Sequence, residues 1–206
     1  MNNGHNDGKP GTTAMNEADS NTDTCCLGVN FVVLSYTSCT ADVYPYDTTY
    51  EPMKNIPIVS GATMFHHPNG ESFILVINEA PYYGERLDHS LLNPNQIRHN
   101  GVGFWGNPYD QNHALGIEVY DMDMEIPMDY SGTKLAFKTP MSIEYELNVL
   151  PRVILTPDSP WNPHEVQLGE VQTGRSTDVT YVRGCRYNWL GVIQMKHISM
   201  NILVQS

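Results

Sequence analysis

A short acidic segment, DSNTDT at residues 19–24, contains the residue types of this chain that could carry chemistry; we call it the acidic loop. Asp19 supplies a carboxylate, Ser20 a small hydroxyl beside it, and the apolar run CCLG at residues 25–28 an anchor in a core. Where a carboxylate carries out acid–base hydrolysis of a peptide bond, it must be held on a tight, anchored loop whose third residue accepts unusual φ and close approach, as Gly does. The alternative is that Asp19 only closes an Asx turn where a strand starts.

The segments that must position this loop predict an all-β core. Residues 25–34, 56–65 and 72–80 are short runs of β-branched and aromatic residues separated by turn formers, as in strands. Between the last two lies Asn69-Gly70, which favours a two-residue type I′ hairpin turn with strands ending near Phe65 and starting near Ser72. The alternating residues 116–137, with a turn at SGT, predict a further strand pair.

One short helix is predicted within residues 89–101, HSLLNPNQIRHNG, because its apolar residues have helical spacing, Pro94 suits a first turn and Gly101 suits a helix end.

Residues 1–17 are polar and are expected to be a disordered lead-in to one domain at residues 18–138. Residues 139–206 are expected to be a proline-rich linker, with one possible helix at 142–149, and the remnant of a following region.

Composition excludes several classes of partner. The chain has 206 residues with 11 Lys and Arg against 23 Asp and Glu, so we expect no nucleic-acid binding by this chain alone. No apolar run approaches the roughly 20 residues of a membrane span, and the N-terminus lacks the order of a signal peptide. We therefore expect no membrane partner and an intracellular, cytoplasmic location.

Metals and cofactors are also not expected. The adjacent His66 and His67 would face opposite sides of a strand, and the four cysteines have no C-x-x-C spacing, which leaves buried free thiols as the better reading. Residues 101–106, GVGFWG, have the letters of a dinucleotide fingerprint, but no buried strand precedes them and no helix pattern follows. We predict a surface turn there.

The segment DSNTDTCCLG looks like the D-S/T-G-A-D-T loop of the retropepsin-like aspartic proteases, in the branch carried by copia-type LTR retrotransposon polyproteins. Residues 68–101 resemble the passage of those proteases from a strand into a short helix with an LLS-x-x-QL core, and DSPWNPH at residues 158–164 resembles the region after the protease. The resemblance covers residues 19–164 and departs at two points. Asn21 replaces the expected glycine, and the few polar residues before Asp19 leave the N-terminal strand of a complete protease missing or degenerate.

The resemblance implies a retropepsin-like closed β-barrel with one short helix, followed by a proline-rich linker. It implies an aspartic endopeptidase without cofactors that cleaves polyprotein peptides as a homodimer, with Asp19 of each copy on the two-fold axis. Ser20 would bond across the dimer, Asp23 would support the loop or bind substrate backbone, and Asn21 would occupy the crowded axis. The hairpin around Gly70 or residues 40–52 would be the flap. The competing hypothesis is an inactive, retrotransposon-derived remnant that acts at most as a self-associating β module.

Overall fold

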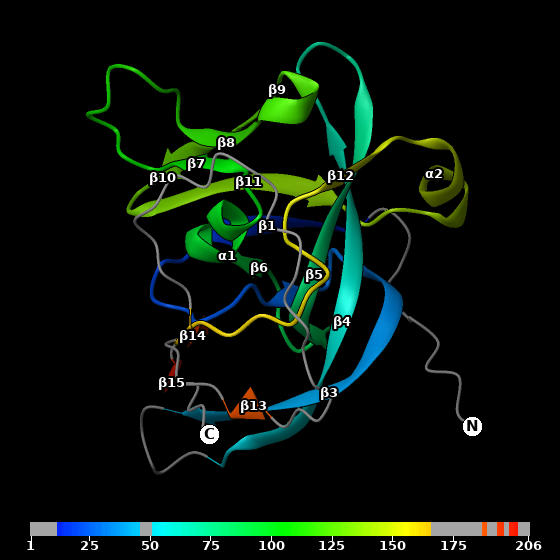
Figure 1. The fold of residues 1–206 in the computed structure, drawn as a ribbon, viewed down its shortest axis with the longest axis vertical. Coiled ribbons are helices and arrows are strands. Elements are labelled where there is room, and N and C mark those ends of the chain that lie inside the picture. Colours follow the sequence, from blue (N-terminus) through cyan, green and yellow to red (C-terminus); the bar gives the residue numbers. More distant parts are fainter. Residues whose placement is uncertain (1–11, 46–50, 166–186, 189–192, 196–197, 202–206) are drawn as a thin grey trace.

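The computed structural model describes residues 12–45, 51–165, 187–188, 193–195 and 198–201, the last three segments in backbone only. This part of the chain is mainly β, as the sequence predicts (Figure 1). Its elements are β1 (Thr13–Ala18), β2 (Leu27–Gly28), β3 (Val32–Pro45), β4 (Met53–His66), β5 (Ser72–Gly84), β6 (Ser90–Leu92), α1 (Pro94–His99), β7 (Gly103–Trp105), β8 (Gly116–Val119), η1 (Tyr120–Met122), β9 (Met124–Pro127), β10 (Asp129–Ser131), β11 (Lys134–Pro140), α2 (Glu144–Val149), β12 (Arg152–Ile154), β13 (Tyr187–Asn188), β14 (Ile193–Met195) and β15 (Ile198–Asn201).

The described strands form three open sheets. The first has the order β10-β11-β1-β6, the second runs β12-β5-β4-β3-β15-β14 with β2 beside β5 and β13 beside β3, and the third is β7-β8-β9. None of these sheets closes on itself among the described strands, so the closed barrel implied by the resemblance is not observed there. Residues 103–105, expected within a surface turn, form β7 instead, because they pair with β8 in a small hairpin.

The hairpin between β4 and β5 is present, but its turn differs from the predicted type I′. The register pairs His66 with Ser72, and the N–H of Gly70 donates to the carbonyl of His67 at 2.9 Å. Pro68 and Asn69 are therefore the central residues, and neither has a positive φ, whereas Gly70 has φ +97°. Proline at the second position of a turn favours type I and explains the difference.

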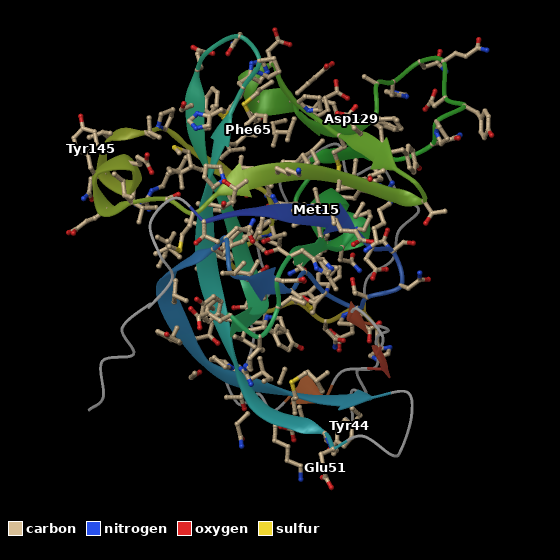
Figure 2. All side chains as sticks on the ribbon, turned by 180° about the vertical axis from the view of Figure 1, so that it is seen from behind. Met15, Tyr44, Glu51, Phe65, Asp129 and Tyr145 are labelled. Atoms are coloured by element: carbon tan, nitrogen blue, oxygen red, sulfur yellow. The ribbon has the colours of Figure 1, made fainter. Side chains whose placement is uncertain are left out.

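Strand β1 lies where the sequence places the lead-in. Residues 13–17 form most of it, antiparallel to β11 and parallel to β6 (Figures 1 and 2, with Met15 labelled on β1 in Figure 2). The strand has little hydrophobic signal because it buries Asn16, whose Nδ2 donates to Thr139 Oγ1 at 2.9 Å and whose Oδ1 accepts from Asn30. The antiparallel neighbour of β1 thus comes from later in the chain, on β11.

The expected linker is also part of the fold. Strand β12 pairs in parallel with β5, and Trp161 is 3% exposed in a hydrophobic cluster with Ile58 and Leu91. The possible helix at 142–149 is α2, shortened to Glu144–Val149. Helix α1 is confirmed inside residues 89–101, and Gly101 follows it with φ +74°. The expected remnant region lies largely outside the described residues.

Two hydrophobic clusters flank the end of the acidic loop. Cys25 belongs to one, with Phe31 and Ile97, and Cys26 belongs to the other. Successive residues of an extended chain face opposite sides, so the adjacent thiols anchor the loop in both clusters. Both are free and buried. The two α-helices are six residues each, and no helix of the described residues has the length and apolar character to span a membrane.

Candidate active-site loop

The acidic loop leaves β1 at Asp19 and is closed by local hydrogen bonds. The N–H of Asp19 donates to the carbonyl of Leu92 on β6 at 2.9 Å, which continues the β1–β6 pairing by one residue. The Oδ1 of Asp19 accepts from the N–H of Asn21 at 2.8 Å, and Thr22 Oγ1 donates to the Asp19 carbonyl at 2.9 Å. Asp19 therefore does close an Asx turn, as the alternative reading expects, while its second carboxylate oxygen is not used in that turn.

The tip of the loop points outward. Ser20 and Asn21 are exposed, and Asp19 is partly buried. Asn21 does not have a positive φ, since the only non-glycine residues of the described chain that do are Asn55, Glu79 and Asp123. The loop therefore closes around Asn21 without left-handed backbone, and only its side chain distinguishes this position from glycine.

Helix α1 holds the loop from one side. Asn93 caps the helix, with its Oδ1 accepting from the N–H groups of Asn95 and Gln96 at 2.8 Å each, and its Nδ2 donates to the carbonyl of Thr22. The side-chain oxygen of Gln96 accepts from the N–H of Cys25 at 2.8 Å. The same short helix therefore fixes both the middle and the end of the loop.

The segment that follows β12 holds the loop from the other side. The indole Nε1 of Trp161 donates to the carbonyl of Asp23 at 2.7 Å, and the Trp161 ring lies against His99, with centroids 5.4 Å apart. In Figure 1 this segment, drawn in yellow after β12, passes below α1. The backbone of Asp23 is thus held by a buried aromatic side chain.

Burial raises the pKa of Asp19 above its ordinary value, and the nearby carboxylate of Glu17 raises it further. The backbone N–H groups of Asn21 and Thr22 and the ammonium of Lys134 act in the opposite direction. Lys134 is itself paired with Glu17, with Nζ and Oε2 2.6 Å apart. The net effect favours a protonated Asp19 more than in an exposed aspartate, which suits a carboxyl that must hold a proton.

Asp23 and Glu79 also have raised pKa values. Burial is the main cause at both residues. At Asp23 the charge of His164 acts in the opposite direction and lowers the pKa. At Glu79 the charge of Asp158 raises the pKa further, and a hydrogen bond from the N–H of Trp161 lowers it. The Oδ2 of Asp23 is buried and has no hydrogen-bond partner among the described residues. A buried carboxylate oxygen without a partner disfavours the ionised form, in agreement with the raised pKa of Asp23.

The structure brings together the four residues named from the sequence, Asp19, Ser20, Asn21 and Asp23, on one loop. It also brings to them Asn93, Gln96 and Trp161, which were not identified as site residues. The available signal for the first two was their polar side chains between the apolar Leu91, Leu92 and Ile97. Trp161 offered a weaker signal, because it stands among prolines in a segment read as a linker.

The loop supplies two carboxyl groups with raised pKa values, those of Asp19 and Asp23. Within the described residues, no group of three or more His, Cys, Asp or Glu side chains is arranged to hold a metal ion. The flap candidate at residues 40–52 includes residues 46–50, which lie outside the described chain. Tyr44 and Glu51, which flank them, lie at the opposite end of the molecule from Phe65 (Figure 2). No family model, no curated protein and no solved structure matches this chain.

Proposed function

We propose that this chain is an aspartic endopeptidase of the retropepsin-like type, carried by a retrotransposon polyprotein and active as a homodimer. The observation that carries the proposal is the setting of Asp19, a partly buried carboxyl at the start of a loop that is fixed from two sides. The neighbouring Ser20 and Asn21 are exposed at the tip, where a second copy can approach. Beyond the loop at Asp19, the sequence has no D-S/T-G loop that could supply a second catalytic carboxylate, so each copy supplies half of an active site.

In the proposed dimer the two Asp19 carboxyls share one proton, because two carboxylates at contact distance do not both ionise. The ionised Asp19 takes a proton from a bound water, which attacks the scissile carbonyl carbon. The protonated Asp19 of the second copy donates its proton to the carbonyl oxygen. Peptide hydrolysis then proceeds through a tetrahedral intermediate, without an acyl-enzyme, and the raised pKa of Asp19 in the single chain supports this role.

The remaining loop residues support the same reaction. Ser20 would donate a hydrogen bond across the dimer and lock the two loops together. Asp23 would support the loop or bind the backbone of a polyprotein substrate, with Trp161 holding the Asp23 carbonyl in place. The free thiols of Cys25 and Cys26 support an intracellular, cytoplasmic location within this proposal.

The second candidate is a remnant that retains the fold and self-association but not turnover. Asn21 favours it, since its exposed side chain stands at the tip where the proposed dimer has its two-fold axis. A side chain at such an axis holds the two loops apart and prevents the carboxyls from sharing a proton. The two candidates share the fold and differ in catalysis alone.

Cleavage of a peptide library by the refolded protein at mildly acidic pH separates the two candidates. The proposal predicts cleavage that is blocked by a peptide carrying a transition-state-mimicking hydroxyl group. Refolding the parent with an equal amount of Asp19→Asn should lower the activity of the parent to about half, because mixed dimers hold only one carboxyl. Folded protein without cleavage favours the remnant, and activity that is insensitive to mixing contradicts the shared site.

A further inference from the structure

The side chain of Gln96 is fully buried, at 0% exposure, and its amide joins three parts of the chain. Its Oε1 accepts from the N–H of Cys25 at 2.8 Å and from Thr24 Oγ1 at 3.0 Å. Its Nε2 lies 3.3 Å from the carbonyl of Glu79 and 3.4 Å from that of Asn78. One amide on α1 therefore connects the end of the acidic loop with the middle of β5.

The point that Gln96 contacts on β5 is unusual in its backbone. Glu79 has φ +52°, a left-handed conformation that a non-glycine residue adopts rarely, and the surrounding contacts must hold it there. The Glu79 carbonyl accepts from Gln96 Nε2, and Thr24 Oγ1, whose single proton has its shorter contact with Gln96 Oε1, lies 3.4 Å from the same carbonyl. The loop end thus donates to the oxygen of the Gln96 amide, and the strained point of β5 accepts from its nitrogen.

An apolar or a carboxylate side chain at position 96 would not make all of these hydrogen bonds. An apolar residue of equal size removes the acceptor of the buried Cys25 N–H and takes one donor from the carbonyls of Asn78 and Glu79. A glutamate keeps the acceptor but, when ionised, sets a negative charge against the carbonyls of Glu79 and Asn78. Only a neutral group that both accepts and donates satisfies all four contacts.

We propose that Gln96 is a positioning residue of the active site: its amide holds the acidic loop against β5 and so fixes where the carboxyl of Asp19 stands. This inference rests on the proposed endopeptidase function for its effect on catalysis. The hold on the loop itself is a property of the single chain and is measured without turnover. The two parts therefore have separate readouts.

The test compares Gln96→Met and Gln96→Glu with the parent and with Thr63→Val. Thr63 is a matched control, because it is also 0% exposed and its hydroxyl bonds Thr139 Oγ1 and the Pro140 carbonyl, neither of which belongs to the acidic loop. Gln96→Met should lower kcat about 10-fold to 100-fold with little change in KM, while Thr63→Val leaves kcat per folded molecule unchanged.

The pH dependence of Gln96→Glu activity separates positioning from a purely structural role, because a purely structural role would leave the activity relative to the parent independent of pH. Its activity relative to the parent should rise as the pH falls, because a protonated glutamic acid again donates to the Glu79 carbonyl. Amide hydrogen exchange gives the readout without turnover. In Gln96→Met the amides of Asn21 and Cys26, which keep their own acceptors, should exchange at least about 10-fold faster than in Thr63→Val.

The outcomes are distinguishable. If Asp19→Asn is inert while Gln96→Met keeps its kcat and its loop protection, the inference about Gln96 is wrong and the proposed function stands. If Asp19→Asn cleaves like the parent, the proposed function is wrong. If every form is inert, exchange decides: faster exchange confined to residues 19–26 supports the hold by Gln96, and unchanged exchange there overturns it.

Discussion

The indole of Trp161 donates a 2.7 Å hydrogen bond to the backbone carbonyl of Asp23, a residue 138 positions earlier in the chain. The contact joins the acidic loop to a segment that follows the last strand of the proposed protease domain. Trp161 is also almost fully buried, against the cluster that contains Cys26 and Leu91. The folded unit that carries the loop therefore extends at least to this tryptophan.

Removing the Trp161 side chain should destabilise the whole unit. Trp161→Ala is expected to lower the free energy of unfolding by about 3–5 kcal/mol, and Trp161→Phe by less, because phenylalanine retains part of the packing and loses the hydrogen bond. Chemical denaturation measures both. Tyr145→Ala, at a side chain that is 70% exposed, is the control and should change stability by less than about 0.5 kcal/mol. Equal stability of Trp161→Ala and the parent would show that the 155–164 segment is dispensable.

Gly70 in the β4–β5 turn is needed for its positive φ, and not because a larger side chain would clash with its surroundings. A Cβ on Gly70 would meet nothing within 4 Å, but its φ of +97° is strained for any side chain. Gly70→Val should cost about 1–2 kcal/mol, and Gly70→Asn less, since asparagine tolerates positive φ best. Thermal unfolding of the two variants tests this. A Tm for Gly70→Val equal to that of the parent would count against the turn geometry.

Asn21→Gly should raise peptidase activity at a matched dimer concentration, because it removes a side chain from the proposed two-fold axis. The backbone at Asn21 does not require glycine, so the same change should lower stability by about 0.5–1 kcal/mol. Kinetics and denaturation of the same preparation separate the two effects. Asn21→Ala is the control: it clears most of the crowding without the entropic cost. Lower activity in both variants would mean that the asparagine side chain contributes to the reaction.

The raised pKa of Asp19 has a consequence for stability that can be measured in dilute, monomeric protein. A raised pKa means that the folded protein stabilises the ionised carboxyl less than water does. The ionised Asp19 therefore lowers the free energy of unfolding at neutral pH, and this effect vanishes when the pH falls below the ordinary pKa of 3.8. Asp19→Asn should therefore be more stable than the parent at pH 7, and this gain should disappear as the pH falls to the unfolded pKa.

Asp110→Asn is the comparison of opposite sign. The N–H of Asn112 and the side chain of His113 lower the pKa of Asp110, so that its carboxylate stabilises the folded state at neutral pH. Its replacement should cost stability at pH 7 and none in strong acid. An Asp19→Asn variant that loses stability at neutral pH, as Asp110→Asn should, would contradict the account of the Asp19 environment.

The β class, the central strands, α1 and the residues of the acidic loop follow from local patterns in the sequence. Strands β4 and β5 are long runs of β-branched and aromatic residues, and Pro94 and Gly101 mark the limits of α1 in the way that helix chemistry requires. Such signals lie within one segment. They can be read without knowing the partners of that segment.

The parts that the sequence did not predict depend on partners distant in the chain. Strand β1 buries Asn16 in hydrogen bonds to Asn30 and Thr139, so it has no apolar periodicity to read. Its neighbour β11 follows it by more than a hundred residues, and β12 joins β5 although prolines surround it. Gln96 and Trp161 reach the loop by the same long-range packing. Only the folded chain shows which buried polar group belongs to the site.

Peptidase activity of Asp19→Asn is the most direct test of the central claim. The amide keeps the Asx turn, since its oxygen still accepts from the N–H of Asn21, but it neither shares a proton nor acts as a base. Parent and variant are compared at equal dimer concentration on the same peptide library. The account predicts cleavage by the parent and no detectable cleavage by Asp19→Asn, with both proteins folded; equal cleavage rates for the two would contradict it.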